Sequence, residues 1–176
     1  MTTKNIMIVG VGGQGTLLTS RILGGLAIGA GYDVKLSEVH GMAQRGGSVV
    51  TFVRYGENVY EPIVEEGQAD VIIAFEKLEA LRYAHFLKKD GVIIVNDWRI
   101  DPMPVVIGTA EYPENIIENL KKEHNVYSVN AMDEAKKLIE KGESPKKVCE
   151  KLNYENYTTF YRNYRKHFGV SPSDKE

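Results

Sequence analysis

The chain has 176 residues, 43% of them hydrophobic, and a formal net charge of −2. This composition supports a folded domain with a sizeable core, excludes a disordered chain, and argues only weakly for a nucleic-acid partner. No apolar run reaches the roughly 18 residues of a membrane span, and the N-terminus lacks the layout of a signal peptide. We therefore expect a cytoplasmic protein with no membrane partner.

Cysteine and histidine usage limits the cofactors that the chain can bind alone. Its one cysteine, Cys149, cannot form an internal disulfide. An iron–sulfur cluster needs about four protein ligands, mostly thiolates. The four histidines are scattered without metal-ligand spacing: His40, His85, His124 and His167. We expect no metal and no bound cofactor on this chain alone.

The first element is a short β-branched run at residues 5–9, which ends in a glycine-rich turn. A segment with apolar residues at helical spacing follows it. The turn consists of Gly10, Gly12, Gly13, Gln14 and Gly15, with Val11 between the first two glycines. A strand, a glycine turn and a helix in this order can hold a phosphate with free backbone N–H groups.

Further apolar runs alternate with helical patterns along the chain. The runs that predict strands are 32–36, 48–54, 71–75, 92–95, 104–107 and 126–129, and the helical patterns are 76–87 and 113–123. This alternation predicts an α/β fold with a Rossmann-like, mainly parallel sheet and helices on both faces. Residues 56–58 are typical of a turn that begins one antiparallel hairpin.

A dense polar loop, residues 37–48, joins the second and third predicted strands. Its chemistry is carried by Glu38, His40, Gln44, Arg45, Gly46 and Gly47. Glycines let the backbone approach a partner closely, while the polar side chains bind or orient it. We interpret the loop as an interface or active-site loop; the alternative is that its side chains only brace the loop internally.

The glycine turn alone leaves two interpretations open, a dinucleotide site and a plain tight turn. Glu38 lies about 20 residues beyond the turn, where an acid would bind ribose hydroxyls. A simple nicotinamide-binding unit would not, however, require the polar loop that Glu38 opens.

After residue 131 the apolar strand runs stop. This predicts a domain of residues 1–132 and a small all-helical tail of residues 133–176. Asp133 is expected to cap a helix that ends before Gly142, and Ser144 with Pro145 to begin a second helix. A third, at about residues 157–167, carries an aromatic stripe formed by Tyr157, Phe160, Tyr161, Tyr164 and Phe168.

Two long motifs give the chain a family resemblance. The glycine turn with residues 18–21, followed by residues 37–47, closely resembles the gamma subunit or domain of 2-oxoacid:ferredoxin oxidoreductases. The likeness continues through residues 67–70 and 76–82 to Asn96 and covers about residues 1–132. The branch that oxidises indolepyruvate and other arylpyruvates is the most similar.

The resemblance implies a role within a complex. Enzymes of this family decarboxylate a 2-oxoacid on thiamine diphosphate, pass electrons through iron–sulfur clusters to ferredoxin, and form an acyl-CoA. In the indolepyruvate branch both cofactors belong to the catalytic alpha subunit. The resemblance therefore implies that this chain is a subunit without cofactors and is inactive alone. Its partner would be the alpha subunit, and it would meet ferredoxin and CoA only through the complex. It also argues against a nicotinamide cofactor.

The tail differs from that family, whose usual closing helix is missing. Residues 135–139, 148–154 and 160–173 instead resemble one helix-turn-helix unit of the AraC family, which a fusion, natural or engineered, would explain. This resemblance implies DNA contacts by Thr158, Thr159, Arg162, Asn163, Arg165 and Lys166. One such unit should bind DNA weakly.

Three alternatives remain open at this point. The chain could be a DNA-binding regulator whose α/β domain senses a ligand, or a standalone nucleotide-binding protein. In the tail, the aromatic stripe could simply pack on the sheet in place of the missing helix. If apolar sheet surface were left bare, the tail or a second copy in a homodimer would have to cover it.

Overall fold

The computed structural model describes residues 2–41, 46–152, 154 and 156–174, and the chain divides into two compact units, residues 1–129 and 130–176. The first unit contains β1 Lys4–Val11, α1 Thr16–Gly29, β2 Asp33–His40, β3 Ser48–Gly56, β4 Ala69–Ala74, α2 Lys77–Tyr83, the 3-10 turn η1 Ala84–Phe86, β5 Leu87–Asn96, α3 Met103–Val106, α4 Ile116–Glu123 and β6 Asn125–Val129. The second contains α5 Ala131–Glu140, α6 Pro145–Lys151 and α7 Tyr157–Phe168.

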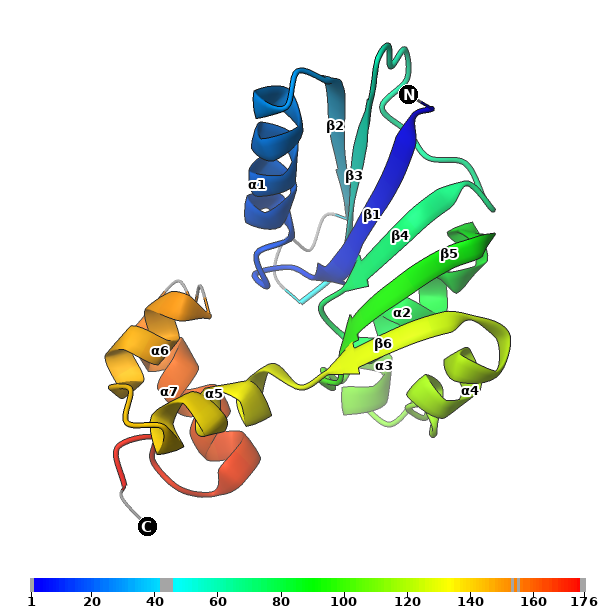
Figure 1. Cartoon of the computed structure of the whole chain (residues 1–176). Coiled ribbons are helices and arrows are strands. Elements are labelled where there is room, and N and C mark those ends of the chain that lie inside the picture. The colour runs from blue at the N-terminus through cyan, green and yellow to red at the C-terminus, as the bar shows by residue number, and fades with distance from the viewer. Residues whose placement is uncertain (1, 42–45, 153, 155, 175–176) are drawn as a thin grey trace. The chain divides into compact units, whose positions relative to one another are not determined.

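The strands form one sheet in the order β2-β3-β1-β4-β5-β6 (Figure 1). The neighbours β1 and β4, β4 and β5, and β5 and β6 are parallel, whereas β3 is antiparallel to both β1 and β2. The expected Rossmann-like, mainly parallel sheet with helices on both faces is confirmed. Because β1, β4 and β5 run in parallel, their carboxyl ends meet at one edge of the sheet, where ligands bind in open α/β folds.

The main core lies between the sheet and the helices α2 and α4. Every second residue of the central strands faces these helices, among them Met7, Ile72 and Ile93, which are fully buried. Ile116 and Leu120 on α4 face the same core. This alternation follows from the period of two in a strand, which sends neighbouring side chains to opposite faces.

The opposite face of the sheet carries α1. A Cβ atom added at Gly24 of α1 would lie 3.2 Å from Leu36 of β2, so helix and strand approach closely there. Leu36 pairs with Val53 of β3, and Val53 with Ile6 of β1. Because directly paired residues share a face, α1 lies over the half of the sheet formed by β1, β2 and β3.

Two sequence-based predictions of local structure are wrong. Residues 104–107 do not form a strand, because Met103–Val106 is the short helix α3, which begins after Pro102 and contains no buried residue. An apolar run of this length cannot distinguish a strand from a helical turn.

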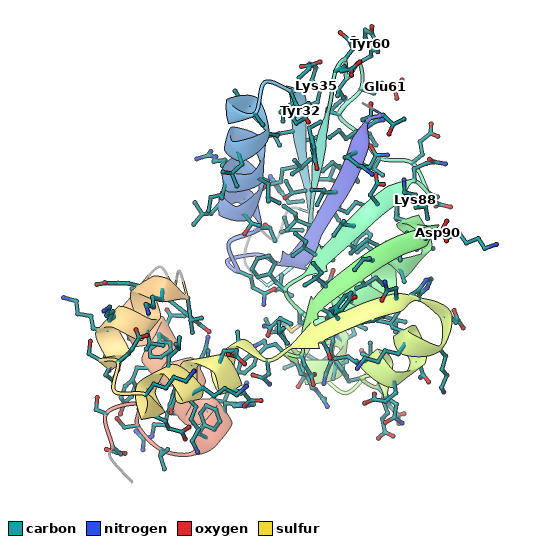
Figure 2. All side chains as sticks on the ribbon, viewed as in Figure 1. Tyr32, Lys35, Tyr60, Glu61, Lys88 and Asp90 are labelled. Atoms are coloured by element: carbon teal, nitrogen blue, oxygen red, sulfur yellow. The ribbon has the colours of Figure 1, made fainter. Side chains whose placement is uncertain are left out.

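The hairpin predicted at residues 56–58 is also wrong, because β3 pairs with the strands before it. The segment after β3 is instead tied down by side chains: Arg54 donates from Nη1 to the Glu61 and Ile63 carbonyls at 3.0 and 2.8 Å, and Val59 N–H donates to Asp33 at 2.8 Å. Figure 2 shows Tyr60 and Glu61 of this segment at the amino-terminal end of β1, away from the glycine turn.

The second unit is a three-helix cluster around an aromatic centre. Phe160 is fully buried and Tyr164 is 4% exposed, and the Phe160 ring packs edge-on against Tyr154 at 5.3 Å. The α5 cap is Asn130, not Asp133 as predicted, because the Asn130 side chain accepts from two N–H groups of the first turn. Ser144 caps α6 as predicted.

Candidate functional site

The glycine turn at the carboxyl end of β1 is closed by a side chain of its own. Gln14 Oε1 accepts from Val11 N–H at 2.7 Å, and Gln14 Nε2 donates to the Phe75 carbonyl at 3.2 Å. A Cβ added at Gly10 would lie 3.0 Å from Gln14 Oε1 and 3.2 Å from the Phe75 Cβ, so a larger residue would fit here only if these neighbours shifted. The turn thus fixes β1, the start of α1 and the end of β4 in one arrangement.

The two motifs that stand out in the sequence meet in space. Gly12 N–H donates to the Gly47 carbonyl at 2.9 Å, which joins the glycine turn to the end of the polar loop. Gly46 has a φ of 79°, a backbone conformation that residues other than glycine adopt only with strain. The last part of the loop therefore lies beside the carboxyl end of β1.

The remaining predicted loop residues lie further from the turn. Glu38 and His40 are exposed on the edge strand β2, and His40 Nδ1 lies 3.0 Å from the Gly41 carbonyl. Gln44 and Arg45 lie outside the described residues. Since β3 separates β2 from β1, Glu38 does not occupy the strand next to the glycine turn, where an acid would bind the ribose of a dinucleotide.

A cavity of about 120 Å³ lies where the loop meets α2. Its lining includes Gly46, Gly47, Ser48, Glu79 and Arg82. Ser48 Oγ donates to Glu79 Oε2 at 2.5 Å, and Arg82 Nε lies 3.3 Å from Glu79 Oε1. The loop is thus anchored to α2 through a carboxylate.

Burial raises the pKa of the Glu79 carboxyl, although the Ser48 hydroxyl and the Arg82 guanidinium partly oppose this effect. Glu79 is only 4% exposed, so its charge is held largely out of water. Ser48, Glu79 and Arg82 are site residues that were not predicted from the sequence. The available signal was the spacing of Glu79 and Arg82, which places them on one helix face.

A second buried carboxylate, Glu76, organises the carboxyl end of β4. It is 1% exposed; its Oε2 caps α2 by accepting from Leu78 and Glu79 N–H at 2.7 and 3.0 Å. Its Oε1 accepts from Ile100 N–H at 3.2 Å and from the Tyr112 hydroxyl at 2.5 Å. One side chain therefore positions α2 and the two segments that follow β5.

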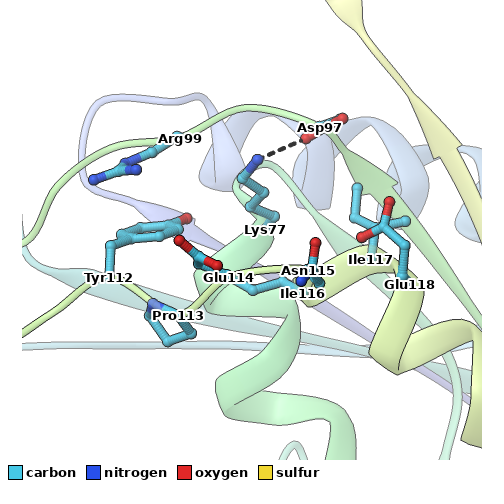
Figure 3. Close-up of a pocket in the computed structure, with 10 residues that line it drawn as sticks. All are labelled: Lys77, Asp97, Arg99, Tyr112, Pro113, Glu114, Asn115, Ile116, Ile117 and Glu118. Carbon is cyan, nitrogen blue, oxygen red and sulfur yellow. Dashed lines mark hydrogen bonds and ion pairs between the residues drawn. The ribbon is translucent and has the colours of Figure 1, made fainter.

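A larger cavity of about 350 Å³ lies next to Glu76, at the carboxyl end of β5. Figure 3 shows Lys77 paired with Asp97, at 3.0 Å, and Arg99 above the Tyr112 ring, at 4.2 Å. Arg99 also pairs with Asp101 at 2.6 Å. Because both cations are already matched by acids, the cavity is of mixed charge and has no preference for an anion.

The predicted DNA contacts lie on α7 in the second unit. Thr158, Arg162, Arg165 and Lys166 are exposed, whereas Thr159 and Asn163 are half-buried. Asn163 forms a hydrogen bond with the Tyr154 hydroxyl, so it is engaged within its own unit. The exposed basic side chains give this helix a positive surface.

Two further properties bear on cofactors and membranes. In the part of the chain that the structure describes, no three His, Cys, Asp or Glu side chains are grouped so that they could hold a metal ion. Over the same residues, no helix combines the length and the apolar character needed to cross a bilayer.

Comparison with known proteins shows the family of this chain. The family described as pyruvate ferredoxin/flavodoxin oxidoreductase matches residues 5–149. The chain belongs to this family. The resemblance inferred from the glycine turn and the polar loop is thereby confirmed, and the match extends beyond the first unit into α6.

Curated members of the family are similar over much of the chain. The indolepyruvate oxidoreductase subunit IorB of Thermococcus kodakarensis is 51% identical over 122 residues, which are 69% of this chain and 59% of that protein. The protein of the same name from Pyrococcus horikoshii is 48% identical over 144 residues, 81% of this chain and 71% of that one. The chain therefore spans about three fifths of the Thermococcus relative.

Among solved structures, the pyruvate oxidoreductase subunit PORC of Thermotoga maritima has the same fold. It superposes with a TM-score of 0.55 at 20% identity and covers 96% of this chain and 86% of that one. At this identity the likeness concerns the fold alone.

Proposed function

We propose that this chain is the subunit without cofactors of a thiamine-diphosphate-dependent oxidoreductase that oxidises 2-oxoacids, with indolepyruvate and related arylpyruvates as substrates. The complex would convert a 2-oxoacid and CoA to an acyl-CoA and CO₂ and pass two electrons to ferredoxin. The observation that carries the proposal is the identity of about half of the aligned residues to proteins named indolepyruvate oxidoreductase subunit IorB. A cytoplasmic location is part of the proposal.

The scarcity of thiol ligands in this chain supports the proposal that a partner subunit binds the redox cofactors. Its one cysteine, Cys149, is buried, and burial raises the pKa of its thiol. A single thiol of this kind cannot supply the several thiolates of an iron–sulfur cluster. The residues present therefore do not fit such a cluster, and no step of the reaction is assigned to them.

We propose that the polar loop is the part of this chain that contacts the partner subunit. Its end is fixed to β1 through Gly12 and Gly47 and to α2 through Ser48 and Glu79. Glu38 and His40 are exposed on the adjoining strand. A firmly held loop base with exposed polar side chains is suited to docking, because little conformational entropy is lost when it binds.

The test is assembly and turnover of a complex between this chain and a large thiamine-dependent partner chain. Glu38→Ala and His40→Ala should weaken assembly and lower the rate of ferredoxin reduction, whereas Tyr60→Ala, at the other end of the sheet, should change neither. Unchanged assembly and turnover in both loop variants would show that the loop is not part of the interface. Keto-acid oxidation by the isolated chain would contradict the subunit role itself.

The regulator alternative is not favoured, because the family match already includes α5 and most of α6, and no helix-turn-helix function is needed to explain those residues. Titration with duplex DNA at rising salt separates the two. A regulator would bind with an affinity that falls steeply as salt increases. We expect only weak binding, and Arg162→Ala should leave assembly of the oxidoreductase intact.

A further inference from the structure

The end of the polar loop meets α2 at a carboxyl group that is almost completely buried. Glu79 is 4% exposed, and its Oε2 accepts from Ser48 Oγ at 2.5 Å. Ser48 is the first residue of β3 and lies directly opposite Val11, the last residue of β1. Because Ser48 Oγ also lies 3.2 Å from the Tyr83 hydroxyl, two side chains of α2 contact this one serine.

The residues just before this serine contact the glycine turn. The Gly47 carbonyl accepts from Gly12 N–H at 2.9 Å. Gly12 is only half-buried, so this hydrogen bond is a main protection of its N–H from water. Whatever holds Ser48 on α2 therefore also holds the loop end, residues 46–48, against the glycine turn.

The surroundings of Glu79 compensate an ionised carboxylate only in part. Among the described residues that line the cavity of about 120 Å³, the charged groups are Glu79 itself and Arg82. The Arg82 side chain is 49% exposed, and its Nε lies 3.3 Å from Glu79 Oε1. Glu76, one turn earlier on α2, places a second buried carboxyl group nearby. A charge on Glu79 is thus poorly hydrated and faces a like charge.

The other elements around this carboxyl group add no charge among the lining residues that the structure describes. β1 and the segment after β5 contribute only apolar side chains to the cavity: Val11, Ile100 and Pro102. His40 of β2 pairs with Val49, the neighbour of Ser48, and so lies on the opposite face of the sheet. Burial is the main effect on the carboxyl group, and it raises the pKa of Glu79. The neutral form therefore suits this position better than the ionised form.

We propose that Glu79 is a positioning residue for the polar loop: through Ser48 it holds the loop end against the glycine turn, and it releases the loop end when it gives its proton to water. A neutral carboxyl group can stay buried, so Ser48 stays on α2. An ionised carboxylate is more stable in water, which favours separation of Ser48 from α2 and of Gly47 from Gly12. The hold is therefore strongest at low pH and weakens as the pH rises through the pKa of Glu79 in the closed form.

Hydrogen exchange of Gly12 N–H in the full chain, followed by NMR, tests this hold. Corrected for the intrinsic exchange rate, the protection of this N–H should fall from pH 5 to pH 8 in the wild-type chain. Glu79→Gln keeps an oxygen that can accept from Ser48 and cannot ionise, so it should keep the protection and remove its dependence on pH. His40 is present in both chains, so its titration cancels in the comparison.

Ser48→Ala tests the link between the carboxyl group and the loop end. It should lower the protection of Gly12 N–H at pH 5 at least about five-fold, because one hydrogen bond is lost. Ser128→Ala, on the exposed strand β6, is the matched control and should leave the protection unchanged. Unchanged protection in Ser48→Ala would overturn the proposal, as would a dependence on pH that is the same in the wild-type chain and in Glu79→Gln.

Assembly with a large thiamine-dependent partner chain extends the test to the complex, and this part rests on the proposed function. A loop end that is held in place should bind the partner more tightly, so the dissociation constant should rise from pH 6 to pH 8 more steeply for the wild-type chain than for Glu79→Gln. An equal rise in both chains would overturn the role of Glu79 in docking. A wild-type chain that binds no such partner at any pH would instead contradict the proposed function, and the exchange of Gly12 N–H would still decide whether Glu79 holds the loop end.

Discussion

Gln14 illustrates what a single residue does at the glycine turn. From the sequence it is one polar residue in a glycine-rich motif, typical of phosphate binding. In the structure its amide bridges Val11 and the Phe75 carbonyl. The glycines can be predicted from spacing, because tight turns and close approach need them. The side chain that fills the turn cannot, since its partner is 61 residues away.

Gly10→Ala tests the packing of this turn. The new methyl group would meet Gln14, Phe75 and Thr16 at 3.0 to 3.2 Å. We expect a loss of about 1 to 3 kcal/mol in the free energy of unfolding, measured by urea denaturation. Gly25→Ala, where an added Cβ meets no described atom within 4 Å, is the control and should not destabilise the chain. Equal stability of the two variants would contradict the close packing at Gly10.

Glu79 gives a pH-dependent prediction. Its folded pKa is raised, mainly by burial, so its contribution to stability is present below the unfolded pKa of about 4.5 and is lost as the pH rises through the folded pKa. Glu79→Gln removes this loss. The stability of the variant relative to wild type should therefore increase from pH 4 to pH 7.

Urea denaturation at several pH values measures this difference. Glu118→Gln, on the exposed side of α4, is measured in parallel as a control for the loss of one carboxylate. A flat or decreasing difference for Glu79→Gln would show that Glu79 is ionised without cost in the folded chain.

At the scale of elements, alternation of strands and helices is sufficient to predict the sheet, whereas strand order is not. The pattern locates the runs that became β1 to β6, but nothing local indicates that β3 inserts between β1 and β2. That insertion moves Glu38 away from the glycine turn. The strand predicted at residues 104–107 is wrong for another reason, because a proline followed by three apolar residues fits a helical turn as well as a strand.

Helix α2 depends on a buried cap, and its removal should be costly. Glu76→Ala leaves the Tyr112 hydroxyl and three N–H groups without their acceptor. We expect a loss of at least about 3 kcal/mol in the free energy of unfolding. Asn130→Ala, which removes the cap of α5, should cost only about 1 kcal/mol. Similar losses in the two variants, measured by chemical denaturation, would mean that Glu76 is an ordinary surface cap.

At the scale of the whole molecule, the family can be predicted from the sequence, but only part of the candidate site can. The glycine turn and the polar loop identify the family because they are long, ordered motifs. Their contact through Gly12 and Gly47 depends on the strand order, and the anchoring by Glu79 depends on how α2 packs. In the tail, helical spacing predicts α7 and its aromatic stripe, but not the ring packing within the second unit that buries Phe160.

The central claim is that the redox chemistry belongs to a partner on which this chain docks. Native mass spectrometry of the chain purified with its large partner, combined with iron and thiamine analysis, tests it most directly. We predict a complex that contains both chains, with iron and thiamine diphosphate present in the complex and absent from the isolated 19.7 kDa chain. An isolated chain that carries iron and thiamine diphosphate, or that oxidises indolepyruvate unaided, would contradict the account.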